Sequence, residues 1–127
     1  MTELVHRVRP AAGEPRGALV LLHGRGADEN DLYPLLDLIY PKRRLVGLTP
    51  GGPLSLPPGG RHWYVVPRVG YPDHDTFHAS YELLQRDVPE LTGVPWARSI
   101  LGGFSQGTVM AYALGLGVGR PAPSPRA

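Results

Sequence analysis

The amino-acid sequence predicts an α/β fold, in which helices cover both faces of a mostly parallel central sheet. Two continuous aliphatic runs, residues 18–22 and 45–49, are typical of strands that are buried on both faces. Helical patterns follow these runs, and an alternation of strands with helices favours a parallel sheet. The chain has 127 residues, of which 42% are hydrophobic, so we expect one small domain with its own core.

The first half of the chain should begin with a strand at the edge of the sheet. Residues 3–8 alternate loosely between polar and apolar side chains and precede a turn rich in Gly and Pro. After the first aliphatic run, residues 28–31 supply capping groups, and residues 32–39 have apolar side chains at helical spacing. Pro41 should end this helix, and the second aliphatic run then forms the next strand.

The second half should contain a long loop, two helices and one more strand. Residues 50–62 are too rich in Gly and Pro for a regular element, so we expect a surface loop that is either one wall of a binding site or a plain connector. A helix should start after the capping residue Asp73 and end before Gly93. A short buried strand over residues 99–104 should lead directly into a helix of small residues, Gln106–Leu116.

The composition excludes several classes of function. The chain contains no cysteine, which rules out disulfides, thiolate metal sites and a cysteine nucleophile. It has 13 basic and 11 acidic side chains, and the basic ones are scattered, so we expect no nucleic-acid partner. No apolar run reaches the roughly 18 residues of a membrane span, and the N-terminus resembles no secretory signal. We therefore expect a cytoplasmic protein.

Two polar clusters have simpler explanations than ligand binding. Asp73, Asp75 and His78 could offer oxygen and nitrogen ligands to a metal ion, but a role in capping the start of a helix explains them with fewer assumptions. The basic triplet of residues 42–44 suits the C-terminal end of a helix and the surrounding solvent. We expect no metal site and no cofactor.

The pentapeptide of residues 103–107, GFSQG, carries the strongest chemical signal. It has the G-x-S-x-G pattern and lies between a predicted strand and a predicted helix, where flanking glycines allow a sharp, strained turn that exposes Ser105 Oγ. The N-terminus of the helix would then point its free N–H groups toward a developing oxyanion. The alternative is a serine that only caps a tightly packed, glycine-rich helix.

A second motif, His23-Gly24-Arg25-Gly26, directly follows the first buried strand. Acyl transfer needs two N–H donors for the oxyanion, and Arg25 can provide one while Gln106 provides the other. A dinucleotide-binding G-x-G-x-x-G is the weaker alternative, because Glu29 stands at the third glycine position. His23 could be mistaken for a catalytic base, but a histidine at the end of a buried strand more often shapes the loop.

The two motifs together, LVLLHGRGADENDL and ILGGFSQGTVMAYALGLG, resemble the phospholipase/carboxylesterase family, which includes small bacterial carboxylesterases and is similar to acyl-protein thioesterases. The resemblance implies a three-layer α/β-hydrolase fold and hydrolysis of small carboxylic esters or thioesters through an acyl-serine intermediate, without a cofactor. It implies that Ser105 is the nucleophile and that Arg25 and Gln106 form the oxyanion hole. By the same resemblance, His62, Trp63 and Tyr64 line the acyl pocket, although simple core packing is an equal alternative for Trp63.

The sequence departs from the family after Ser105. Family members present their triad in the order Ser, Asp or Glu, then His, but the 22 residues after Ser105 contain none of the last three. The resemblance therefore implies the N-terminal part of one hydrolase domain over residues 1–120, truncated before the last strands and helices, and a Pro-rich disordered tail over 121–127. The nucleophile strand would become an exposed edge.

The missing acid and base leave two hypotheses for function. In the first, the chain derives from a serine carboxylesterase and is inactive, or nearly so, as these 127 residues alone. In the second, it is a non-catalytic remnant or a binding module that keeps the nucleophile turn and the oxyanion loop. An upstream histidine could replace the base only through unusual geometry; the candidates are His6, His62, His74 and His78. The sequence leaves the oligomeric state open.

Overall fold

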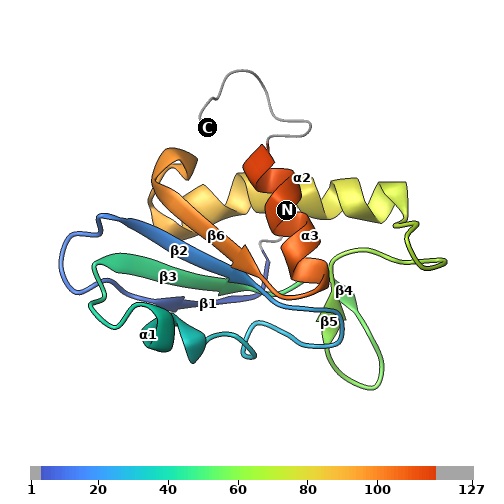
Figure 1. Ribbon diagram of the computed structural model, residues 1–127, viewed down its shortest axis with the longest axis horizontal. Coiled ribbons are helices and arrows are strands. Elements are labelled where there is room, and N and C mark those ends of the chain that lie inside the picture. Colours follow the sequence, from blue (N-terminus) through green and yellow to red (C-terminus); the bar gives the residue numbers. More distant parts are fainter. Residues whose placement is uncertain (1–3, 117–127) are drawn as a thin grey trace.

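The computed structural model describes residues 4–116 and contains the predicted, mostly parallel sheet (Figure 1). The strand order is β1 (His6–Arg9), β3 (Leu45–Pro50), β2 (Gly17–Leu22), β6 (Ser99–Gly103). The edge strand β1 runs antiparallel to β3, as short edge strands often do, while β3, β2 and β6 are parallel to one another. The predicted edge strand and the two predicted central strands are thus confirmed, with small shifts in their bounds.

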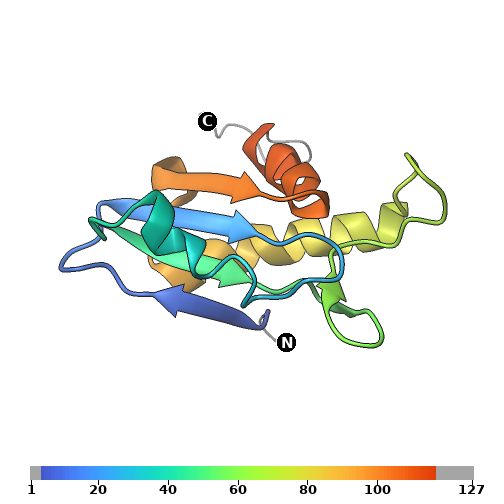
Figure 2. The same cartoon turned by 60° about the horizontal axis from the view of Figure 1, so that its bottom comes forward.

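Strand β2 is buried along its whole length and separates the two layers of helices. Its side chains alternate between two hydrophobic clusters, as the two-residue period of a strand requires. One face joins the larger cluster with α2 (His74–Thr92) and α3 (Gln106–Leu116); the other contacts Leu36 of α1 (Leu35–Ile39). Figure 2 shows α1 in front of the sheet and α2 behind it, and Figure 1 shows α3 on the same side of the sheet as α2. The three-layer arrangement that the sequence predicts is confirmed.

The first helix is shorter than the sequence predicts. The apolar spacing of residues 32–39 suggested a helix over that whole range, but the structure confines it to the five residues of α1, with Pro34 at the N-cap. Proline has no N–H to donate and is disfavoured within a helix, so it fits the start. Only Leu36 of this helix is fully buried, whereas Ile39 is 57% exposed.

The predicted surface loop over residues 50–62 contains a small hairpin, which the sequence did not indicate. Strands β4 (Leu54–Ser55) and β5 (Arg61–His62) pair antiparallel. Gly60, with φ of 117°, lets the chain turn back, and its carbonyl accepts a 2.9 Å hydrogen bond from the N–H of Leu56. The prediction of an irregular loop was wrong here because two-residue strands carry no readable periodicity.

The second predicted helix is confirmed at both ends. The carboxylate of Asp73 accepts a 2.9 Å hydrogen bond from the N–H of Thr76 at the start of α2. Gly93 ends the helix in the left-handed conformation, with φ of 72°, and its N–H bonds the carbonyl of Pro89. A 3₁₀ turn, Trp96–Arg98, then leads into β6.

Strand β6 is less buried than the sequence predicts. Within the described residues it pairs only with β2, and Ile100 is 56% exposed. The prediction of a buried strand was therefore wrong, whereas the exposed apolar edge implied by the family resemblance is present. None of the helices in residues 4–116 is long and apolar enough to cross a bilayer. The expected tail over residues 121–127 lies outside the described residues.

Helix α1 offers a direct test of the smaller cluster. We expect Leu36→Ala to lower the free energy of unfolding by about 2–5 kcal/mol, because it empties a fully buried site between α1 and the sheet. Leu38→Ala on the same helix is the matched control, since Leu38 is 76% exposed and its truncation should change stability by less than about 0.5 kcal/mol. Urea unfolding measures the loss for both variants. Equal losses of unfolding free energy would contradict the packing of Leu36 between α1 and the sheet.

Candidate active site

Ser105 lies on the turn between β6 and α3, where the sequence predicts a strained serine. Its φ is 56°, in the left-handed region that residues with a side chain rarely adopt, and the residue is exposed. The flanking glycines are required by packing: a Cβ on Gly103 would lie 2.5 Å from the carbonyl carbon of Gly107, and one on Gly107 would collide with the carbonyl oxygen of Leu22. The predicted turn geometry is confirmed.

The loop of residues 23–26 lies beside this turn. Leu22 and Gly103 are partners at the carboxyl ends of the parallel strands β2 and β6, so the segments that follow them leave the sheet at the same edge. A Cβ on Gly24 would lie 3.4 Å from Cβ of Ser105 and 3.1 Å from the ring of Phe104. A side chain at residue 24 would press on Phe104, so glycine suits this close approach of the loop to the serine turn.

Both predicted oxyanion donors lie in these two segments. Among the described residues, the hydrogen bonds around the two turns include none donated by the backbone N–H of Arg25 or of Gln106. The neighbouring N–H groups are engaged: that of Gly26 donates to the carbonyl of Arg61 at 2.8 Å, and that of Gly107 to the carbonyl of Phe104 at 3.0 Å. Two N–H groups on adjacent loops are thus without a backbone acceptor among the described residues, and their role as oxyanion donors stays a prediction.

The side chain of Gln106 ties the serine turn to the segment after β5. Its Oε1 accepts a 2.6 Å hydrogen bond from the N–H of Trp63, and its Nε2 donates a 2.9 Å bond to the carbonyl of Tyr64. All three residues are buried. The sequence indicates a role only for the backbone N–H of Gln106, because nothing in a single sequence reveals where a buried amide side chain finds its partners.

His23 holds the start of the loop of residues 23–26 in place, which is called the oxyanion loop below after its proposed role. Its Nδ1 donates to the carbonyl of Gly24 at 2.7 Å, and its Nε2 accepts from the N–H of Gly52 at 2.9 Å, which requires the neutral Nδ1–H form. The ring also stacks on Trp63, with centroids 5.0 Å apart. Burial lowers the pKa of His23, against the smaller opposing effects of the Gly24 carbonyl and nearby carboxylates. Both ring nitrogens are thus engaged in the fold, which favours a role in shaping the loop over the base alternative.

The residues expected to line an acyl pocket differ in their surroundings. Trp63 is completely buried in the larger cluster, and its Nε1 donates to the carbonyl of His23 at 2.8 Å, an arrangement that matches the core-packing alternative. Tyr64 is also in that cluster, and burial raises its pKa. His62 is 8% exposed, and burial together with the charge of Arg25 lowers its pKa. Their contact with an acyl group stays a prediction.

The other histidines lie elsewhere. His6 is on β1, where its Nδ1 approaches the carbonyl of Leu4 at 2.8 Å. His74 and His78 pair with each other at the start of α2, with ring centroids 4.3 Å apart. Asp73, the first member of the metal alternative, caps this helix. Within residues 4–116, no three His, Asp or Glu side chains gather as metal ligands.

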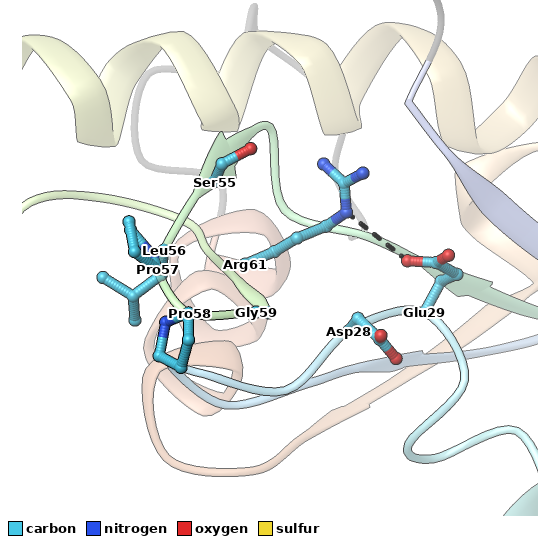
Figure 3. A pocket seen from close by; sticks show the side chains of 9 residues that line it. Asp28, Glu29, Ser55, Leu56, Pro57, Pro58, Gly59 and Arg61 are labelled. Carbon is cyan, nitrogen blue, oxygen red and sulfur yellow. Dashed lines mark ion pairs between the residues drawn. The ribbon is translucent and has the colours of Figure 1, made fainter.

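A pocket of about 430 Å³ lies between the β4–β5 hairpin and the segment that follows the oxyanion loop (Figure 3). Residues 55–61 form one wall and Asp28 and Glu29 form the other. Arg61 closes one side through an ion pair of 3.5 Å between its Nε and Oε1 of Glu29. The long loop lines this pocket, but Ser105 is not among the lining residues, so the interpretation of the loop as one wall of a binding site stays a prediction.

The neutral state of His23 makes stability depend on pH. The unfolded chain binds a proton at His23 near pH 6.5, whereas the folded chain resists it because the pKa is lowered, so stability should fall as the pH drops below about 6.5. In His23→Gln the loss of unfolding free energy that protonation of His23 causes at low pH should be missing, although this variant is less stable overall. Urea midpoints at fixed protein concentration measure it. His78→Gln at an exposed site should keep the original slope, and an unchanged slope in His23→Gln would contradict the assignment.

The side-chain amide of Gln106 can be tested in the same way. Gln106→Leu keeps the volume but leaves the N–H of Trp63 and the carbonyl of Tyr64 buried without a partner, so we expect a loss of about 2–5 kcal/mol in unfolding free energy. Gln85→Leu, at a partly exposed position on α2, should cost less than about 0.5 kcal/mol. Similar costs for the two variants would show that these hydrogen bonds do not hold the segment.

Comparisons with known proteins place this geometry in context. No protein-family model and no curated protein matches the sequence. Esterase PE8 matches in structure with a TM-score of 0.73 and 28% identity, over 92% of this chain and 59% of that one. A carboxylesterase from Mesorhizobium loti matches with a TM-score of 0.73 and 23% identity, over 86% of this chain and 52% of that one. Acyl-protein thioesterase 2 from Zea mays matches with a TM-score of 0.62 and 24% identity, over 87% and 50%.

This chain thus spans between half and three fifths of the length of these proteins. The match to esterase PE8 covers most of this chain. The described part of the chain therefore has the α/β-hydrolase fold, and it resembles the carboxylesterases and acyl-protein thioesterases of the phospholipase/carboxylesterase family.

Proposed function

We propose that this chain carries the nucleophile half of a serine ester hydrolase, which acts on small carboxylic esters or thioesters. The observation that carries the proposal is the left-handed backbone of Ser105 on a strand-to-helix turn, directly beside a glycine-rich loop with a free N–H. A serine that only capped α3 would have no need of a strained φ, and strain of this kind concentrates at functional sites. The esterases and the thioesterase that match in structure support the same class of reaction.

In the proposed reaction, Ser105 Oγ attacks the carbonyl carbon of the substrate and its proton passes to a base. The carbonyl oxygen becomes an oxyanion, which the N–H groups of Arg25 and Gln106 stabilise together with the N-terminal dipole of α3. When the C–O or C–S bond breaks, the protonated base gives its proton to the leaving alcohol or thiol, and an acyl-serine remains. Water then attacks this acyl-serine while the base accepts a proton from it, and the base returns that proton to Ser105 Oγ as the bond to the acyl group breaks and the acid leaves. No metal or cofactor takes part in this scheme.

The base and its orienting acid have no counterpart after Ser105 in this sequence. The 22 residues that follow the serine contain no Asp, Glu or His. Without a base, Ser105 Oγ stays protonated at neutral pH and attacks rarely. The oxyanion donors and substrate binding alone should then give a rate about 10³–10⁴-fold above that of the reaction in water. As these 127 residues, the chain should be inactive or nearly so.

The absence of Asp, Glu and His after Ser105 also favours a second candidate function. In this alternative the chain is a binding module that retains the serine turn and the loop of residues 23–26 but performs no chemistry. Such a module would bind a carboxylate or ester oxygen at the two free N–H groups without turnover. Under either proposal the partner is a small molecule, and neither calls for a nucleic acid. A cytoplasmic location stays a prediction.

Hydrolysis of an activated aryl ester separates these functions. We expect at most marginal turnover from the 127-residue chain, and efficient turnover once the chain is extended with the C-terminal half of the Mesorhizobium loti carboxylesterase. In the extended chain, Ser105→Ala should lower turnover by about 10⁴–10⁶, whereas Ser99→Ala, at the start of β6, should have little effect. An extended chain that folds but stays inactive favours the binding module. Efficient turnover by the short chain would show that a histidine upstream supplies the base.

A further inference from the structure

The hairpin of β4 and β5 is joined to the oxyanion loop by two backbone hydrogen bonds. The N–H of Gly26, the last residue of the loop, donates to the carbonyl of Arg61 at 2.8 Å, and the N–H of Arg61 donates to the carbonyl of Ala27 at 2.7 Å. Two successive residues on one side thus oppose a single residue on the other, and the first of the two is a glycine with φ of 91°. This is the pattern of a G1 β-bulge, a feature that is frequent next to active sites.

Glycine is needed on both sides of this contact, for different reasons. A Cβ on Gly60 would collide with the carbonyl oxygen of Gly26, so the two backbones touch directly. A Cβ on Gly26 would have open space around it, and there the left-handed φ is what disfavours other residues. Gly59, the neighbour of Gly60, has neither constraint, because a Cβ there would meet nothing within 4 Å and its φ is not left-handed. The two glycines of the hairpin are therefore a matched pair, of which only Gly60 holds the contact.

The side chain of Arg61 extends the contact to both ends of the loop. Its Nε forms the 3.5 Å ion pair with Oε1 of Glu29, which follows the loop (Figure 3). This oxygen is buried and accepts no hydrogen bond within residues 4–116, so Arg61 provides its charge partner. Nη1 of Arg61 donates to the carbonyl of Gly52 at 3.3 Å, and the N–H of Gly52 donates in turn to Nε2 of His23, where the loop begins. One arginine thus connects to both ends of the loop.

The N–H of Arg25 lies between these anchored ends. The N–H of Ala27 donates to the carbonyl of Gly24 at 3.2 Å, which closes a turn of four residues with Arg25 and Gly26 in its centre. The φ of Gly26 is close to the value of about 80° that the third residue of a type II turn needs. The N–H groups of Gly26 and Ala27 are both engaged, whereas that of Arg25 has no backbone acceptor among the described residues. The direction of the Arg25 N–H is therefore a property of this turn.

The loop contacts its two neighbouring segments through different residues. Through Gly24 it approaches the serine turn, and through Gly26 it bonds the hairpin. A shift of the hairpin would therefore move Gly26 and rotate the peptide of Arg25, while Ser105 stays on its own turn between β6 and α3. Displacement of a catalytic group by about 1 Å can lower a rate by about 10²-fold. The position of the hairpin thus matters for an oxyanion donor that it does not itself provide.

We propose that Arg61 is a positioning residue for the oxyanion hole, and that the bulge it forms with Gly26 sets the direction of the Arg25 N–H. The proposal rests on the proposed function, because it takes this N–H as an oxyanion donor. In this role Arg61 acts on the loop and forms no bond to the reacting atoms. The oxyanion develops only in the transition state, so loss of the positioning lowers kcat and leaves KM nearly unchanged.

Amide hydrogen exchange in the full 127-residue chain tests the contact without any need for activity. Gly60→Ala should speed the exchange of the N–H groups of Gly26 and Arg61 at least about tenfold, with the N–H of Val20 in β2 as the internal reference. Gly59→Ala is the matched control and should leave all three rates unchanged. Arg61→Met, which removes the ion pair, should speed the exchange at Gly26 at least about threefold, and it serves as the second variant if Gly60→Ala does not fold. Unchanged exchange at Gly26 in the folded variants would overturn the proposal.

Kinetics of the extended chain, with the same aryl ester, test the positioning itself. Gly26→Ala and Arg61→Met should each lower kcat at least about tenfold and change KM less than about twofold. Arg61→Lys restores a positive charge beside Glu29 and should recover part of the lost kcat. Gly13→Ala is the matched control for backbone strain, because Gly13 has φ of 95° and open space like Gly26 but lies just after β1, so this variant should keep its kcat.

The results separate this proposal from the proposed function. If the extended chain is active through Ser105 but keeps its kcat in Gly26→Ala and Arg61→Met, the positioning role is wrong and the hydrolase stands. A loss of kcat in Gly13→Ala equal to that in Gly26→Ala would assign the effect to strain, which also overturns the positioning role. A folded extended chain without Ser105-dependent turnover removes the oxyanion role of Arg25 and overturns both.

Discussion

The arrangement of the site depends on one close contact, where the first turn of α3 meets the end of β2. A side chain on Gly107 would collide with the carbonyl oxygen of Leu22 and lie 2.5 Å from that of His23, so only glycine lets the helix approach this near. The approach has two effects. It forces the chain between β6 and α3 into a tight turn, which places Ser105 in the left-handed region, and it brings the oxyanion loop beside the serine. The close packing at Gly107 therefore sets the backbone geometry on which the proposed chemistry depends.

A buried polar network fixes the surroundings of that contact. The ring nitrogen Nε2 of His23 accepts a hydrogen bond from the N–H of Gly52, and the backbone carbonyl of His23 accepts one from Nε1 of Trp63. The backbone N–H of Trp63 in turn donates to the side-chain oxygen of Gln106. Each member satisfies a group that would otherwise be buried without a partner, at a cost of about 1–3 kcal/mol apiece. Gln106, whose backbone N–H is one of the two proposed oxyanion donors, is thus held in place by its own side chain. Trp63 lies in this network as a structural member, which explains why it is completely buried.

Prediction from the sequence succeeded where one residue type has one physical reason to be present. The aliphatic run of residues 18–22 predicted a doubly covered strand, and the glycines around Ser105 predicted the turn, because few other sequences meet those demands. It failed where the outcome depends on partners far away in the chain. The exposure of Ile100 depends on which strands lie beside β6, the hairpin over residues 54–62 depends on contacts with the oxyanion loop, and the amide of Gln106 finds acceptor and donor some forty residues upstream. Tertiary contacts of this kind leave no local pattern.

The proposed nucleophile and the proposed oxyanion donors lie on neighbouring turns at one edge of the sheet, and residues 106–127 contain no Asp, Glu or His that could activate the serine. The central claim is that the two loops form one oxyanion hole, and a crystal structure with an aryl phosphonate bound covalently to Ser105 tests it most directly. The account predicts one phosphonyl oxygen at about 2.7–3.1 Å from the backbone nitrogens of both Arg25 and Gln106. A phosphonyl oxygen that contacts neither nitrogen, with the two N–H groups directed apart, would contradict it.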